Sequence, residues 1–145
     1  MLLKNNLIAI VAYVSMCIIL IPLNFVWHLG IWWGKMEMRS IISGTVTVSI
    51  HTIVSLCLCL WVGRKFLINT YNMLTNIFSV GAIAIIPVVV ILAFYKNPLA
   101  GVLVNPIYPI SETISYFLNI DLKHSYLLVS LLPSLTMWLG MITKR

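Results

Sequence analysis

Residues 40–62 read SIISGTVTVSIHTIVSLCLCLWV and contain no Lys, Arg, Asp or Glu. As an α-helix that rises about 1.5 Å per residue, this stretch would be roughly 34 Å long. That length exceeds the hydrocarbon thickness of a bilayer, which is about 30 Å. Two basic residues, Arg64 and Lys65, follow almost directly. The stretch therefore predicts a membrane-spanning helix with His51 near its midpoint.

The composition of the whole chain fits the same class of protein. Of 145 residues, 61% are hydrophobic and 8% are charged, whereas soluble domains contain about 25% charged residues. The nine Lys and Arg exceed the three acids to give a net charge of +6. They stand at the ends of apolar runs, where basic residues anchor helices to lipid headgroups. We expect one membrane domain over residues 1–145 and no nucleic-acid partner.

Three further apolar runs have the length of a membrane span. They are residues 7–27, 77–95 and 125–143, and they contain Pro22, Pro87 and Pro133 in that order. Proline is tolerated in membrane helices because neighbouring helices satisfy the backbone groups that it frees. The sequence therefore predicts an all-α integral membrane protein with four transmembrane helices.

The third of these spans is expected to bend. Pro87 lies at its centre, and its first half contains the small residues Ser79 and Gly81. Proline and small residues are the usual causes of sharp kinks in helices. Small side chains also let a neighbouring helix approach closely.

Residues 96–124 form the longest segment between predicted spans. The pairs Asn97-Pro98 and Asn105-Pro106 are typical of turns. After Pro109, apolar residues recur at helical spacing at positions 110, 114, 117 and 118, with Ser111 as the expected N-cap. This spacing predicts a short amphipathic helix at the membrane interface. Whether the segment lies on the surface or dips back into the membrane stays open.

The basic residues indicate an orientation. With four spans both termini share one side, and that side carries Lys4, Arg64, Lys65, Lys144 and Arg145. The opposite side carries Lys35, Arg39, Lys96 and Lys123, together with all three acids. Because Lys and Arg favour the cytoplasmic side, we expect both termini in the cytoplasm of a cell-membrane protein. The proline-rich segment 96–124 is then extracytoplasmic.

A polar stripe runs along the predicted helix 40–62. Its members recur every three or four residues and are Ser40, Gly44, Thr47, His51 and Ser55. Such positions share one helical face, and small or hydroxyl side chains let membrane helices pack closely and form hydrogen bonds. Intramembrane ionisable residues often mark proton or ion paths, but no predicted span contains an Asp or Glu to pair with His51. The stripe is therefore either a packing surface or the lining of a pore.

A second cluster of charges lies on the long connecting segment. Its members are Glu112, Asp121, Lys123 and His124. A catalytic role would pair Asp121 with His124 and use Ser111, Ser115 or Ser125 as the nucleophile. The sequence contains no Gly-x-Ser-x-Gly or His-Glu-x-x-His motif. We expect these charges to cap and anchor helix ends, and the chain not to be an enzyme.

No metal or cofactor site is expected from the cysteines. Cys17, Cys57 and Cys59 all lie inside apolar runs, where cysteine behaves as a small hydrophobic residue. Cys57 and Cys59 are two positions apart, which places them about 200° apart around a helix. They cannot readily share a metal ion.

The sequence favours a non-catalytic function. The leading hypothesis is a small accessory, regulatory or immunity-type subunit that docks on a larger membrane protein, because the chain has little intramembrane chemistry and no soluble domain. The alternative is a homo-oligomeric transporter or channel whose path is lined by the polar stripe around His51. An interfacial enzyme that uses Asp121 or His124 is a third, weaker hypothesis. The expected partners are the lipid bilayer and either a larger membrane protein or further copies of the chain.

Overall fold

The computed structural model describes residues 1–23, 39–70, 72–94 and 102–144; side chains are not described at residues 39–45, 47 and 94. The elements are α1 (Leu2–Ile19), α3 (Arg39–Phe66), α4 (Met73–Phe78), α5 (Ala82–Phe94), the 3-10 turn η2 (Asn105–Ile107), α7 (Tyr108–Leu118), α8 (Leu122–Val129) and α9 (Leu132–Ile142). These described ranges contain helices and no strand. The all-α prediction is confirmed for this part of the chain.

Three helical stretches are long and apolar enough to cross a membrane. They are Leu2–Leu23, Val48–Phe66 and Leu122–Ile142. They coincide with the predicted spans 7–27, 40–62 and 125–143, although the end of the first prediction lies outside the described residues. The predicted span 77–95 differs, because its longest apolar helix, Ala82–Ala93, is shorter than the other three.

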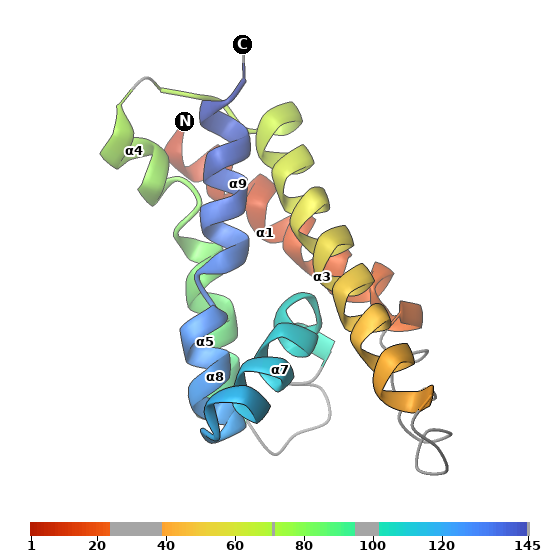
Figure 1. Ribbon diagram of the computed structural model, residues 1–145. Helices are drawn as coiled ribbons and strands as arrows, with labels where there is room; N and C mark the ends of the chain where they lie inside the picture. Colours follow the sequence, from red (N-terminus) through yellow and green to blue (C-terminus); the bar gives the residue numbers. More distant parts are fainter. Residues whose placement is uncertain (24–38, 71, 95–101, 145) are drawn as a thin grey trace.

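The helices form a bundle with both chain termini at one end (Figure 1). α1 and α5 lead away from that end, whereas α3 and the consecutive pair α8 and α9 lead towards it. α3 makes its most extensive contact with α9, and α1 packs on both α3 and α5. α7 lies between α8 and the first half of α3, away from the termini.

Two glycines allow α3 and α9 to touch through their backbones. A Cβ atom added at Gly63 of α3 would overlap the carbonyl of Met137, and one added at Gly140 of α9 would overlap the carbonyl of Leu60. Small residues permit this kind of approach between helices.

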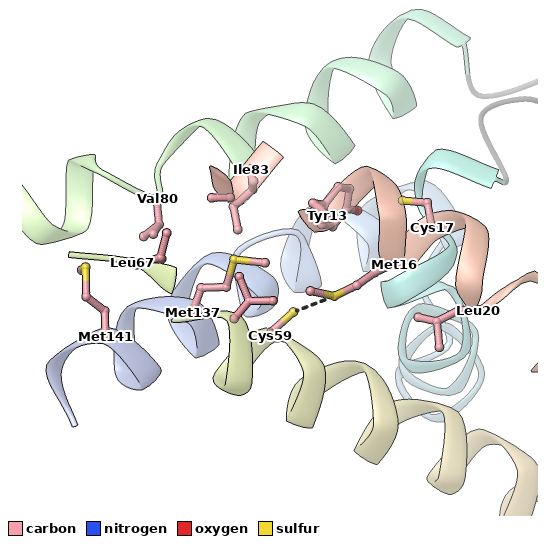
Figure 2. Packing of buried hydrophobic residues seen from close by; sticks show 12 residues of the cluster. Tyr13, Met16, Cys17, Leu20, Cys59, Leu67, Val80, Ile83, Met137 and Met141 are labelled. Carbon is pink, nitrogen blue, oxygen red and sulfur yellow. Dashed lines mark hydrogen bonds between the residues drawn. The ribbon is translucent and has the colours of Figure 1, made fainter. Parts of the chain in front are cut away.

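The main apolar core lies beside this contact and joins α1, α3 and α9 to the segments on either side of α4 (Figure 2). Its largest fully buried members include Tyr13, Leu20, Leu67, Ile83, Met137 and Met141.

The predicted kink in the span 77–95 is a complete break located at residues 79–81, between α4 and α5. Pro87 lies inside α5 and does not end it. The side-chain amide of Asn6 in α1 bonds to a backbone carbonyl before the break and to a backbone N–H after it. Its Nδ2 donates to the carbonyl of Phe78 at 3.0 Å, and its Oδ1 accepts from the backbone N–H of Ala82 at 3.2 Å.

Two more side chains hold the same region. Ser134 of α9 donates from Oγ to the carbonyl of Val80, inside the break, at 2.9 Å. Asn5 is fully buried, and its Nδ2 donates to the Ser79 hydroxyl at the break at 3.4 Å. It also bonds both backbone groups of Ile68, in the connection between α3 and α4, from Nδ2 to the carbonyl at 2.9 Å and from the N–H to Oδ1 at 3.0 Å. A freed backbone group in an apolar interior needs such a partner. These bonds explain how the chain can leave the helical path here.

The predicted span 125–143 is also divided, between α8 and α9 at Ser130 and Leu131. Ser130 and Leu131 keep right-handed helical dihedrals, so the backbone continues from α8 into α9. Pro133, in the first turn of α9, has no N–H to donate, which interrupts the hydrogen-bonding pattern of the helix at this point.

We expect Gly140→Ala to lower the stability of the folded chain by about 1–3 kcal/mol, because the added methyl group meets backbone that cannot rotate away. The measurement is the midpoint of thermal unfolding in detergent. Gly81→Ala is the matched control, since a Cβ there would lie 3.6 Å from its nearest neighbour, the carbonyl of Phe78. Equal midpoints for the two variants would contradict the close contact between α3 and α9.

Candidate functional site

His51 lies on α3 and has no exposed surface. Its Nε2 is 3.1 Å from the backbone carbonyl of Asn105 in η2. A carbonyl can only accept a hydrogen bond, so Nε2 carries a hydrogen, and the neutral ring is the Nε2–H tautomer. In the neutral ring the other nitrogen, Nδ1, holds a lone pair and is an acceptor.

Asn105 contacts both α3 and α1. It is 1% exposed, and its Nδ2 donates to the carbonyl of Cys17 at 3.0 Å. The Cys17 carbonyl lies near the C-terminal end of α1. This bond also orients the amide, because only its NH₂ group can donate. The side-chain oxygen Oδ1 therefore points elsewhere.

Residues 102–107, the inserted segment, are held on both sides by side chains of long helices. Ser55 of α3 donates to the carbonyl of Pro106 at 3.0 Å. From α1, the Tyr13 hydroxyl and the Cys17 thiol donate to the carbonyl of Leu103 at 3.1 and 3.4 Å. Three backbone carbonyls of the segment therefore accept hydrogen bonds from buried side chains, which fixes it between α1 and α3.

Two acceptors at this point have no partner. His51 Nδ1 and Asn105 Oδ1 are buried and make no hydrogen bond with any described residue. Leaving a buried polar atom unpaired costs about 1–3 kcal/mol. Unpaired atoms of this kind call for an explanation such as a bound molecule or a functional role. We therefore take His51 and Asn105 as the centre of the candidate site.

The inserted segment shows where part of the predicted connecting segment 96–124 lies within the protein. Val104 and Ile107 are buried in a second apolar cluster with residues of α5 and α8. Residues 104–107 thus lie in the interior, and this part of the segment 96–124 is not on the surface. The end of α7 differs, since Tyr116, Phe117 and Leu118 are 84%, 77% and 62% exposed.

The predicted amphipathic helix is present as α7, but its start is not where we expected. Ser111 is not the N-cap, because the helix begins at Tyr108 with Ile107 at the cap position and Pro109 in the first turn. Ser111 is buried and donates to the carbonyl of Ile107 at 3.0 Å. Proline favours the first turn of a helix, and that preference sets the start.

The polar stripe faces the protein's own interior in the part that the structure describes. His51 and Ser55 are buried, and the same face continues with the buried residues Cys59 and Gly63 at spacings of four. The other members, Ser40, Gly44 and Thr47, lie in α3, but their side chains fall outside the description. At His51 and Ser55 the stripe therefore contacts the inserted segment of the same chain.

The charge cluster on the connecting segment does not form one site. Glu112 accepts a hydrogen bond from the Tyr108 hydroxyl at 2.7 Å within α7. Asp121 caps α8 by accepting from the backbone N–H of Lys123 at 2.9 Å. His124 is exposed and is joined to Asp121 through backbone atoms. These residues act at helix ends and on the surface.

The three candidate nucleophiles are engaged in local bonds. Each serine hydroxyl donates to a nearby backbone carbonyl: Ser111 to Ile107, Ser115 to Ile120 and Ser125 to Leu122. Among the described residues no group of three or more His, Cys, Asp or Glu is placed to hold a metal ion. Cys57 is exposed and Cys59 is buried, which fits their expected positions on different faces of the helix.

The sequence analysis missed Asn105 as a site residue. The Asn-Pro pair was interpreted as a turn, and its apolar neighbours Leu103, Val104 and Ile107 were the signal that this turn is buried. The comparisons with known proteins add no assignment: no family model matches the chain, and no curated protein or solved structure is similar to it.

Ser55→Ala should destabilise the fold by about 1–3 kcal/mol, because it leaves the buried carbonyl of Pro106 without a donor. Thermal unfolding in detergent measures the loss. Ser15→Ala serves as the control, since the Ser15 hydroxyl is exposed and bonds within its own helix, to the carbonyl of Val11. If both variants unfold at the same temperature, the bond to the inserted segment contributes nothing.

Proposed function

We propose that the chain is an integral membrane protein with four passes and both termini in the cytoplasm. α1, α3 and the α8–α9 pair have the length for three passes. The third pass in chain order is made by α4 and α5 together, on either side of the break at residues 79–81. The end of the bundle that carries the termini also carries the C-terminal end of α3 with Arg64 and Lys65. This basic end is the one that the positive-inside rule assigns to the cytoplasm.

Within the membrane we propose a non-catalytic accessory or regulatory role, in which the chain docks laterally on a larger membrane protein. One observation carries this role: most buried polar groups of the described residues are bonded to the protein's own backbone. The candidate nucleophiles are engaged in the same way. What the chain offers to its surroundings is mainly apolar surface, such as the α1 face formed by Leu3, Leu7, Val11, Val14 and Ile18.

A second candidate function is transport, and one specific observation favours it. The two unpaired acceptors lie where the 3-10 turn η2 is held between α1 and α3. In membrane proteins such backbone is tolerated where it is buried in protein or lines a cavity, and transporters place binding sites at interrupted helices near the bilayer midplane. Because His51 and Ser55 are covered by their own chain, this candidate places the path inside one chain and not between copies.

The accessory role predicts a partner that co-purifies at fixed stoichiometry from the native membrane in a mild detergent. We expect Gly44→Leu to reduce recovery of that partner several-fold, because a bulky side chain on the first half of the stripe would obstruct helix contact. Val46→Leu is the matched control on the same helix, at a position that is 51% exposed. Isolation of the chain alone, or an unchanged complex with Gly44→Leu, would contradict this role.

The transport role predicts that His51→Ala abolishes flux while the protein still inserts and elutes as a single species. Proton uptake by proteoliposomes that contain a pH-sensitive dye is the first assay, since His51 is the ionisable side chain at the centre of the site. The rate should fall to that of protein-free vesicles. His124→Ala, which alters an exposed histidine, should leave the rate unchanged. Undiminished uptake by His51→Ala would make the histidine purely structural.

A further inference from the structure

We propose that the point where His51 meets Asn105 is a binding site for a small neutral molecule that donates hydrogen bonds, of the size and polarity of water or ammonia. The site is formed by the two unpaired acceptors, His51 Nδ1 and Asn105 Oδ1. It is independent of the accessory role and requires no net transport.

The chemistry of both atoms is fixed by the bonds that their residues already make. His51 uses Nε2 on the Asn105 carbonyl, and Asn105 uses Nδ2 on the Cys17 carbonyl. Each of those partners can only accept, so neither the imidazole nor the amide can be turned without losing a bond. Both remaining atoms are acceptors, and the ligand must therefore be a donor.

The residues that carry the two acceptors are in contact in the interior. Their residues are joined by the 3.1 Å contact between His51 Nε2 and the Asn105 carbonyl. The two residues are 0% and 1% exposed, and the surrounding side chains of Tyr13, Cys17 and Ser55 are themselves engaged with the inserted segment. A large ligand does not fit such packed surroundings.

The charges around the site favour a neutral ligand. The elements that hold it, α1, α3 and η2, contain no Asp or Glu. The neighbouring helix α7 carries Glu112, whose carboxylate is engaged with the Tyr108 hydroxyl of the same helix. A buried cation would therefore lack a counter-charge, which is costly in an apolar interior. An anion would meet two lone pairs and gain no donor. The class of ligand that fits both acceptors is therefore a neutral molecule that can donate hydrogen bonds.

The test is nitrogen NMR of the full chain in lipid bilayers with ¹⁵N-labelled histidine. The chain has three histidines, so the double variant His28→Gln/His124→Gln leaves His51 as the sole source of signal. We expect one protonated ring nitrogen and one unprotonated ring nitrogen. The unprotonated signal should be shifted to lower frequency by an accepted hydrogen bond, with magnetisation transfer from solvent protons.

Two results would overturn the proposal. An unshifted nitrogen without transfer from solvent would mean that the acceptors stay dry, and a doubly protonated ring at neutral pH would mean that the site holds a proton as a cation. Titration with ammonium chloride at mildly alkaline pH distinguishes the ligands, since a further shift indicates ammonia and no change indicates water. If the double variant does not fold, His28→Gln and His124→Gln separately identify the signals to subtract from those of the unaltered chain.

Discussion

Backbone groups that are freed inside an apolar bundle must find hydrogen-bond partners, and this constraint organises the protein. The chain leaves its α-helical path at residues 79–81 and again at the 3-10 turn of the inserted segment 102–107. At the first place side chains of other helices bond backbone carbonyls and an N–H group, and at the second they bond backbone carbonyls. Asn6 and Ser134 serve the first place, and His51 and Ser55 contribute to the second. The long helices therefore supply the interrupted segments with the partners that regular secondary structure would otherwise provide.

α3 is the helix on which most of this arrangement converges. One of its faces presents, at spacings of four, His51, Ser55, Cys59 and Gly63. The first two hold the inserted segment, and the last allows the backbone of α9 to approach. A single small and polar face thus fixes both the position of the connecting segment and the closest helix contact of the bundle. Because this face contacts both the inserted segment and α9, it is buried along the part of α3 whose side chains are described.

The functional proposals rest on two features, the exposed apolar surface of α1 and the buried acceptors that have no hydrogen-bond partner. If the chain lies in a bilayer, its outward surface on α1 is a stripe of exposed apolar residues suited to lipid or to a partner helix. Its interior contains two hydrogen-bond acceptors without a partner, one on His51 of α3 and one on Asn105, which also bonds to α1. The first feature favours lateral association and the second favours a bound molecule. The two features lie on different parts of the structure and do not compete.

The sequence by itself determined the class of the protein and the general positions of its helices. Long uncharged runs, helical spacing after Pro109 and the paired basic residues after residue 63 are local features, and a helix forms its backbone bonds within its own segment. The same local reasoning placed His51 and Ser55 on one face.

What the tertiary structure decided is where the helices break and which groups the polar side chains contact. Asn105 lies 88 residues from Cys17 and 54 from His51, and contacts across such distances have no signature in local spacing. The kink that Pro87, Ser79 and Gly81 together predict in the third span is a break at residues 79–81, where Asn6 and Ser134 can satisfy the freed backbone, and Pro87 stays inside α5.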